Sequence, residues 1–251
     1  MGILDGKAAL VTGAGQGVGR GIALALAAEG ARVMSAGRTL EKVQDTAAEI
    51  GRRGGEGAAV AADVKDEPAI DHAVTATVER FGTVDILVNN AQEVTIAPLA
   101  ELTRQAMDDS WRSGPLATFS FMQACYPHLR GGGVIVNLAT GMGLRADSQL
   151  YAAYVAAKEA IRAMTRTAAM EWGPEGIRAN VIIPLAASEG FARWGERYPE
   201  RYERFVDSIP LRRVGRTEED IGRAAVFLCG PDGDYVTGTT LMVDGGQAYL
   251  H

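Results

Sequence analysis

Cysteine and histidine, the side chains that bind most transition metals in proteins, are scarce in this chain of 251 residues. The two cysteines, Cys125 and Cys229, lie far apart in the sequence, and the histidines at positions 72, 128 and 251 are scattered. Neither set has the spacing of a metal site. We therefore expect no bound metal, and we expect both cysteines to be buried as small apolar side chains.

Positive charge is also in short supply, since the formal net charge is −6. A nucleic-acid partner requires a basic surface, and the one small basic cluster, Arg212, Arg213 and Arg216, is typical of a solvated loop. No run approaches the roughly 18 apolar residues that suggest a membrane span. The segment containing Asp5 and Lys7 leads directly into a strand-like run and lacks the features of a signal peptide. We expect a cytoplasmic protein without nucleic-acid or membrane partners.

Hydrophobic residues make up 47% of the chain, which is long enough to bury one large core. No repeat or linker divides residues 1–251, so we expect a single domain. Short apolar runs without period-two alternation, typical of strands buried on both faces, alternate with helix-like stretches. The predicted strands are Ala8–Thr12, Arg32–Ala36, Gly57–Ala61, Val84–Asn89, Val134–Ala139, Ala179–Ile183 and Thr240–Val243. The predicted helices cover residues 18–29, 40–53, 67–81, 101–130, 151–172, 190–206 and 218–230.

This alternation predicts an α/β fold, a doubly wound and mainly parallel sheet of about seven strands flanked by helices. In such sheets ligands bind beyond the carboxyl ends of the strands. Functional residues are therefore expected just after Thr12, Ala36, Ala62, Asn89, Ala139 and Ile183.

A glycine-rich segment, TGAGQGVG at 12–19, joins the first predicted strand to the first predicted helix. Glycines there permit a tight turn and let backbone amides approach a pyrophosphate at the helix N-terminus. The segment predicts dinucleotide binding, with an ordinary strand–helix turn as the alternative. The residues expected to contact the nucleotide are Gly13, Gly15, Gln16, Gly17, Val18 and Gly19.

The end of the second predicted strand, Ala36-Gly37-Arg38-Thr39, carries no carboxylate that would repel a ribose 2′-phosphate. Arg38 could hold that phosphate through charge-assisted hydrogen bonds, which favours NADP(H) and leaves NAD(H) possible. The alternative is that Arg38 only caps a surface loop. Asp63 and Val64, after the third strand, are expected near the adenine. The residues after the fourth strand that are expected to border the cofactor are Asn89, Asn90 and Ala91.

Tyr154 and Lys158 are separated by four residues within a helix-like run, which places both side chains on one helical face. An ammonium group beside a phenol favours the phenolate and lowers the pKa of the tyrosine, which suits a proton donor or acceptor. Taken alone, such a pair is more often a solvated helix face. Tyr151 lies seven residues before Lys158 and is the weaker candidate.

Five motifs in order give the sequence a resemblance to the short-chain dehydrogenase/reductase family over nearly its whole length. They are TGAGQGVG at 12–19, ADV at 62–64, NNA at 89–91, YVAAK at 154–158 and YVTGTTLMVDGG at 235–246. The resemblance implies a Rossmann-like domain, a nicotinamide cofactor, and hydride transfer between NADP(H) or NAD(H) and a carbonyl or secondary alcohol. It also implies that Tyr154 is the general acid/base, that Lys158 binds the nicotinamide ribose, and that Pro184 lies beside the cofactor.

Several positions depart from the pattern of that family. Thr140 stands where a serine usually holds the substrate oxygen, with Ser148 a less suitable donor. Gly114 replaces an asparagine that supports a proton relay, while Gln92 and Leu185 replace glycines. These changes fit a working reductase with an altered proton path, in which Gly114→Asn raises turnover. They also fit a catalytically silent homologue that acts as a nucleotide-binding or scaffold protein. A lyase, hydratase or epimerase has no positive feature here.

Residues 185–213 are expected to form a substrate lid by resemblance. Within them Trp194, Tyr198, Tyr202 and Phe205 have the spacing of one apolar helical face, which favours a bulky hydrophobic carbonyl or alcohol substrate. An ordinary core or subunit contact explains the stripe equally well. The resemblance also implies a homo-oligomer, a dimer or tetramer, in which the apolar strand Thr239–Val243 could pack between subunits.

Overall fold

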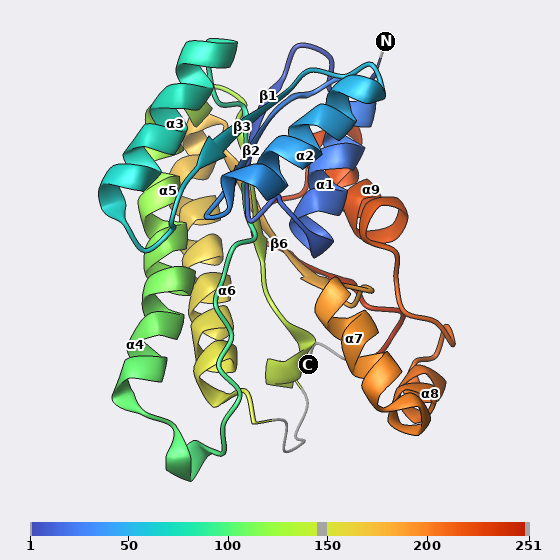
Figure 1. Ribbon diagram of the computed structural model, residues 1–251. Coiled ribbons are helices and arrows are strands. Elements are labelled where there is room, and N and C mark those ends of the chain that lie inside the picture. Colours follow the sequence, from blue (N-terminus) through green and yellow to red (C-terminus); the bar gives the residue numbers. More distant parts are fainter. Residues whose placement is uncertain (1, 145–149, 249–251) are drawn as a thin grey trace.

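The computed structural model describes residues 2–144 and 150–248, in which seven strands form one parallel sheet between two layers of helices (Figure 1). The strand order is β3-β2-β1-β4-β5-β6-β7, and every neighbouring pair is parallel. The strands are β1 Ala8–Thr12, β2 Arg32–Gly37, β3 Gly57–Ala61, β4 Ile86–Asn89, β5 Val134–Leu138, β6 Arg178–Pro184 and β7 Thr240–Val243. The predicted doubly wound α/β fold is confirmed.

The helices divide between the two faces of the sheet (Figure 1). One face carries α1 (Gly17–Ala28), α2 (Leu40–Arg52) and α9 (Arg223–Cys229). The other carries α3 (Glu67–Phe81), α4 (Arg104–Trp111), α5 (Ala117–Leu129) and α6 (Ala152–Trp172). Each layer buries its own apolar cluster against the strands, and both Cys125 and Cys229 are buried as predicted. Short 3₁₀ turns cover Leu99–Glu101, Gly141–Leu144, Gly173–Glu175 and Pro231–Gly233.

Proline accounts for two differences from the predicted helices. The helix predicted over 101–130 begins at Arg104, after Thr103 accepts the Ala106 N–H, and it changes to a π-helical turn at Arg112–Leu116. This turn contains Pro115, which has no N–H to donate. The helix predicted over 190–206 is two helices, α7 (Glu189–Arg197) and α8 (Pro199–Ser208). They separate at Tyr198 because a residue before proline is disfavoured in the helical conformation.

Other boundaries lie close to the predictions. Val84 and Ala139 fall outside β4 and β5, while β6 extends from Arg178 to Pro184. The helix predicted over 218–230 begins as a π-helical turn, Thr217–Gly222, which α9 continues. Among the described residues, no helix has the length and apolar character needed to cross a membrane.

Strands β2 and β3 lie on one side of β1, and strands β4 to β7 lie on the other. Strands β1 and β4 are therefore neighbours although they are distant in sequence. The loops that follow these two strands therefore leave the sheet on opposite sides and open a crevice between them. This is where the structure brings the predicted nucleotide residues together.

Candidate active site

A cleft of about 430 Å³ lies beyond the carboxyl ends of β1, β2, β3 and β4. The predicted nucleotide residues that line it are Gly13, Gly15, Gln16, Gly17, Val18, Arg38, Asp63, Val64, Asn90 and Ala91. Residues that sequence reasoning missed are Gly37, Thr39, Lys42, Val43, Ala62 and Glu93, together with Gln92, which was noted only as a departure from the family. Four of the six loops that were expected to carry functional residues, those after β1, β2, β3 and β4, therefore line this cleft. Thr140, Lys158 and Pro184 do not line it.

The glycine-rich segment has the backbone that a dinucleotide requires. Gly13 and Gly17 have φ values of +65° and +55°, which a residue with a side chain rarely adopts. Helix α1 begins at Gly17, and its first turn has no acidic residue to oppose an anion. A Cβ on Gly15 would lie 2.8 Å from the Cβ of Lys42, so a side chain would collide with the rim of the cleft. These residues fit the pyrophosphate of a dinucleotide.

Gly19 has a different role, because it lies behind the cleft where α1 meets the sheet. A Cβ at this position would lie 2.4 Å from both the Asn90 Nδ2 and the Gly13 carbonyl oxygen. Asn90 donates from Nδ2 to the Thr12 carbonyl at 3.0 Å, and the backbone N–H groups of Asn90 and Ala91 donate to Thr12 Oγ1 at 3.0 and 3.1 Å. These bonds hold the loops after β1 and β4 against each other.

Asn89, which was predicted to border the cofactor, points into the interior instead. Its Nδ2 donates to the Asn137 Oδ1 at 2.9 Å, and the Nδ2 of Asn137 donates to Thr165 Oγ1 at 2.9 Å. All three side chains are buried. Asn89 therefore links β4 to β5 and α6, and it holds the floor of the site in place.

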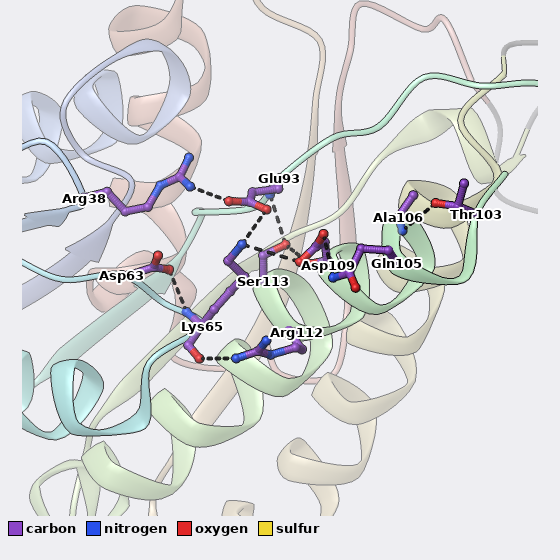
Figure 2. Close-up of polar contacts among 10 residues, drawn as sticks. All are labelled: Arg38, Asp63, Lys65, Glu93, Thr103, Gln105, Ala106, Asp109, Arg112 and Ser113. Atoms are coloured by element: carbon purple, nitrogen blue, oxygen red, sulfur yellow. Dashed lines mark hydrogen bonds and ion pairs between the residues drawn. The ribbon is translucent and has the colours of Figure 1, made fainter.

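A carboxylate faces Arg38, although the end of β2 itself carries none, as the sequence shows. Glu93 follows β4, 55 positions further along the chain, and its carboxylate accepts a hydrogen bond from Arg38 Nη1. Figure 2 shows Glu93 between Arg38 and Lys65, whose ammonium group lies 2.9 Å from the Glu93 Oε2. The prediction considered only residues next to Arg38, whereas parallel strands bring the loops after β2 and β4 to the same edge.

Tyr154, Thr140 and Lys158 meet at the carboxyl end of β5. The side chains of Tyr154 and Thr140 lie close enough for the Thr140 hydroxyl to affect the pKa of the phenol. Lys158 is buried, with 3% of its surface exposed, and its Nζ donates to the Leu138 carbonyl oxygen at 2.6 Å. The same Nζ lies 5.6 Å from the centre of the Tyr154 ring. The four-residue spacing therefore places both side chains together as predicted.

The pKa of Tyr154 moves opposite to the expectation. Removal from water raises the pKa of Tyr154 to about 12, although the nearby Thr140 hydroxyl acts to lower it. Burial also lowers the pKa of Lys158 to about 7, because no carboxylate among its described neighbours compensates the ammonium charge. A lysine that loses part of its charge at neutral pH provides less stabilisation to a phenolate. In this state the tyrosine holds its proton.

The Gln92 side chain occupies the space where a side chain at position 114 would lie. A Cβ on Gly114 would lie 2.8 Å from Cδ and Nε2 of Gln92 and 3.0 Å from its Oε1. The Gln92 amide donates weakly to Ser110 Oγ, at 3.4 Å, and its Oε1 is buried without a described partner. The two departures from the family pattern are thus one packing arrangement: a side chain from the loop after β4 occupies the volume beside a glycine in the π-helical turn.

The aromatic residues of segment 185–213, the predicted lid, pack mainly on one another. Phe191, Trp194, Tyr202 and Phe205 form a part-buried cluster between α7 and α8, with ring centres 5.4 to 6.2 Å apart. Tyr198, which was predicted in the stripe, lies outside the helices and is exposed near Arg197 and Arg201. The predicted stripe is wrong at this position, because the break before Pro199 changes the helical phase.

The lid segment begins beside the nucleotide loop. Ser188 accepts the Phe191 N–H at the start of α7, and its Cβ lies 3.6 Å from where a Cβ on Gly17 would stand. Pro184 ends β6, and Leu185 pairs with Val243 of the edge strand β7. Ser148, the weaker candidate donor, lies outside the described residues.

Known proteins match this geometry over almost the whole chain. The family model described as enoyl-(acyl carrier protein) reductase matches residues 13–248. The chain belongs to the short-chain dehydrogenase/reductase family. It is 40% identical to a 12alpha-hydroxysteroid dehydrogenase of a Clostridium species, with 98% of each chain covered. It is 36% identical to a sorbitol dehydrogenase of Cereibacter sphaeroides, with 97% of this chain and 98% of the relative covered.

The chain is also similar to a solved short-chain dehydrogenase from Burkholderia cenocepacia in complex with NADP, with a TM-score of 0.89. It is 32% identical, and the match covers 97% of this chain and 98% of the other. As a short-chain dehydrogenase/reductase, the chain is an NAD(P)-dependent oxidoreductase that interconverts alcohols and carbonyls.

Proposed function

We propose that this protein is an oxidoreductase that transfers a hydride between NADP(H) and the carbonyl or secondary alcohol of a hydrophobic substrate. The observation that carries the proposal is the cluster of Tyr154, Thr140 and Lys158 at the end of β5, beside the glycine-rich nucleotide cleft. The cluster offers a proton, a second hydrogen-bond donor and a buried amine. The cleft offers a turn and a helix N-terminus suited to a pyrophosphate.

Reduction of a ketone adds a hydride to the carbonyl carbon and a proton to its oxygen. A nicotinamide cofactor, held by Gly13, Gly15 and Gly17, supplies the hydride when bound. Tyr154 donates the proton, and its raised pKa keeps the hydroxyl protonated at neutral pH. Thr140 donates a hydrogen bond to the same substrate oxygen. Alcohol oxidation reverses the steps: Tyr154 accepts the proton as a phenolate, and Lys158 provides positive charge nearby when its amine is protonated.

Arg38 supports the preference for NADP(H). Its guanidinium lines the cleft at the end of β2, and 58% of its side chain is exposed, so it can reach an adenosine 2′-phosphate. The solved relative that carries NADP is consistent with this assignment. Asp63 and Val64 also line the cleft and are the residues that we propose contact the adenine.

The lid segment supports a hydrophobic substrate. Its four aromatic rings pack between α7 and α8, and this short unit starts next to Gly17. We propose that this unit covers a bulky apolar ketone. The 40% identity to a hydroxysteroid dehydrogenase favours steroid-like compounds as first candidates, while the sorbitol dehydrogenase calls for polyols in the same panel.

The proposal is tested by following nicotinamide absorbance with a panel of keto-steroids, other bulky ketones and polyols, with NADPH, NADP⁺, NADH and NAD⁺. Tyr154→Phe should lower kcat by roughly 10²- to 10⁴-fold, the usual contribution of a general acid. Tyr151→Phe, which removes a neighbouring phenol at the start of the same helix, is the matched control and should retain activity. Equal rates in wild type and Tyr154→Phe would contradict the assignment.

The alternative of a catalytically silent nucleotide-binding or scaffold protein gains support from Gln92 and Gly114, since the family asparagine is missing there. It predicts tight NADPH binding together with no turnover across the whole panel. Calorimetric titration with NADPH, run beside the absorbance assay, separates the two functions.

A further inference from the structure

Glu93 lies in the wall of the nucleotide cleft and is held there from two sides (Figure 2). Its backbone N–H donates to Ser113 Oγ at 3.1 Å, and that hydroxyl donates to the Asp109 carbonyl at 2.7 Å. Its carboxylate accepts from Lys65 Nζ at 2.9 Å. This bond raises the pKa of Lys65, so the ammonium stays charged. Glu93 is therefore a fixed negative charge in the cleft.

Arg38, by contrast, is the movable member of the pair. Its side chain is 58% exposed, against 28% for Glu93 and 21% for Lys65. Among the described residues, the side chain that pairs with the Arg38 guanidinium is Glu93. An exposed ion pair of this kind contributes little to stability, so a ligand phosphate in the cleft can displace the carboxylate from Arg38 at little cost.

We propose that Glu93 sets the cofactor preference by competing with the 2′-phosphate of NADP(H) for Arg38. This inference rests on the proposed function, in which Arg38 holds that phosphate. The phosphate carries about −1.5 to −2 charges at pH 7, so it must displace the carboxylate from Arg38 and tolerate a fixed negative charge nearby. NAD(H) brings no phosphate there and leaves the Arg38–Glu93 pair intact. Glu93 thereby reduces the ratio by which the protein binds NADP(H) more tightly than NAD(H).

The test measures binding rather than turnover. Dissociation constants for NADPH, NADH, 2′,5′-ADP and 5′-AMP are determined by calorimetry for wild type, Glu93→Gln, Arg38→Ala and the double variant. Glu93→Gln keeps the shape of the side chain and removes its charge. We expect NADPH and 2′,5′-ADP to bind roughly five- to tenfold more tightly, from release of the ion pair and loss of repulsion. NADH and 5′-AMP should change less than about twofold, the scale of a weak exposed contact.

Two further results make the expectation specific. The gain should disappear in the Arg38→Ala background, since no guanidinium remains to compete for, and it should shrink at high salt because the charges are screened. Glu56→Gln is the matched control: Glu56 pairs with Arg80 at 2.8 Å outside the cleft, and its loss should leave all four constants unchanged.

The outcomes separate this inference from the proposed function. If Arg38→Ala weakens NADPH but Glu93→Gln leaves the NADPH/NADH ratio unchanged, the competition is refuted and the proposed function stands. Weaker NADH binding in Glu93→Gln also refutes it, because the carboxylate would then accept a ribose hydroxyl. If wild type binds neither dinucleotide, or if Arg38→Ala has no effect on NADPH, the assignment of Arg38 fails and the inference fails with it.

Discussion

Placing an asparagine at position 114 should destabilise this protein, although the sequence alone suggested a gain in turnover. A Cβ on Gly114 would lie 2.8 Å from the Gln92 amide, so the end of this flexible, part-buried side chain must shift. Overpacking costs about 1–3 kcal/mol, and the lower end of this range applies here because only the end of a flexible side chain has to move. The better helix propensity of asparagine over glycine returns only a few tenths of a kcal/mol. For a chain of this size each kcal/mol lowers the melting temperature by roughly 2–4 °C.

The compensating change is Gln92→Gly, which empties the space that the asparagine needs. Gln92 makes one weak described hydrogen bond through its amide, so its loss alone should cost less than the overpacking. The double variant should recover stability, with a coupling energy of about 0.5–3 kcal/mol, as found for residues in contact. If Gln92 blocks a proton path, the double variant should also gain turnover where Gly114→Asn alone does not.

The assay is thermal and urea unfolding of the four proteins of this cycle, followed by circular dichroism, with kcat measured in parallel. Gly51→Asn is the matched control, since a Cβ on Gly51 in α2 would meet nothing within 4 Å. That variant should be close to wild type in stability. If Gly114→Asn is as stable as wild type, or if the two substitutions are additive within about 0.5 kcal/mol, the packing argument is refuted.

Three other predictions follow from burial and exposure. Lys158 has a pKa lowered to about 7 from 10.5, so its charge is buried at a cost below pH 7, and Lys158→Met should stabilise the fold there by at most roughly 5 kcal/mol. Between pH 7 and 10.5 the lysine binds more protons in the unfolded chain than in the folded protein, so the stability of wild type rises with pH. The stability gained by Lys158→Met should therefore vanish as the pH rises towards 10.5. Gly19→Ala should destabilise the protein and abolish nucleotide binding in calorimetry, because the new methyl meets Asn90 and the Gly13 carbonyl at 2.4 Å. The exposed Trp111 and Phe119 on α4 and α5 (41% and 46%) favour a subunit contact, so Trp111→Glu should reduce the mass measured by light scattering; an unchanged mass would remove this face as the interface.

Features that depend on residues close together in the chain could be predicted from the sequence. Continuous apolar runs separated by helix-like stretches predicted the parallel sheet, because strands buried on both faces lose polar alternation. The segment 12–19 predicted the nucleotide turn, since only glycine readily adopts the φ values seen at Gly13 and Gly17. The four-residue spacing of Tyr154 and Lys158 placed both on one face of α6, as helical geometry requires.

The contacts that each of these residues makes could not be predicted from the sequence, because they depend on how the helices and strands pack. Glu93 meets Arg38, and Gln92 meets Gly114, because the parallel sheet gathers loops from distant parts of the chain at one edge. Asn89 turns inward rather than towards the cleft for the same reason: its partner Asn137 lies on the adjacent strand. The pKa values of Tyr154 and Lys158 depend on how much water the fold removes from around them. Sequence spacing describes contacts within one helix or strand, whereas charge pairing, packing volume and burial are set by contacts between elements.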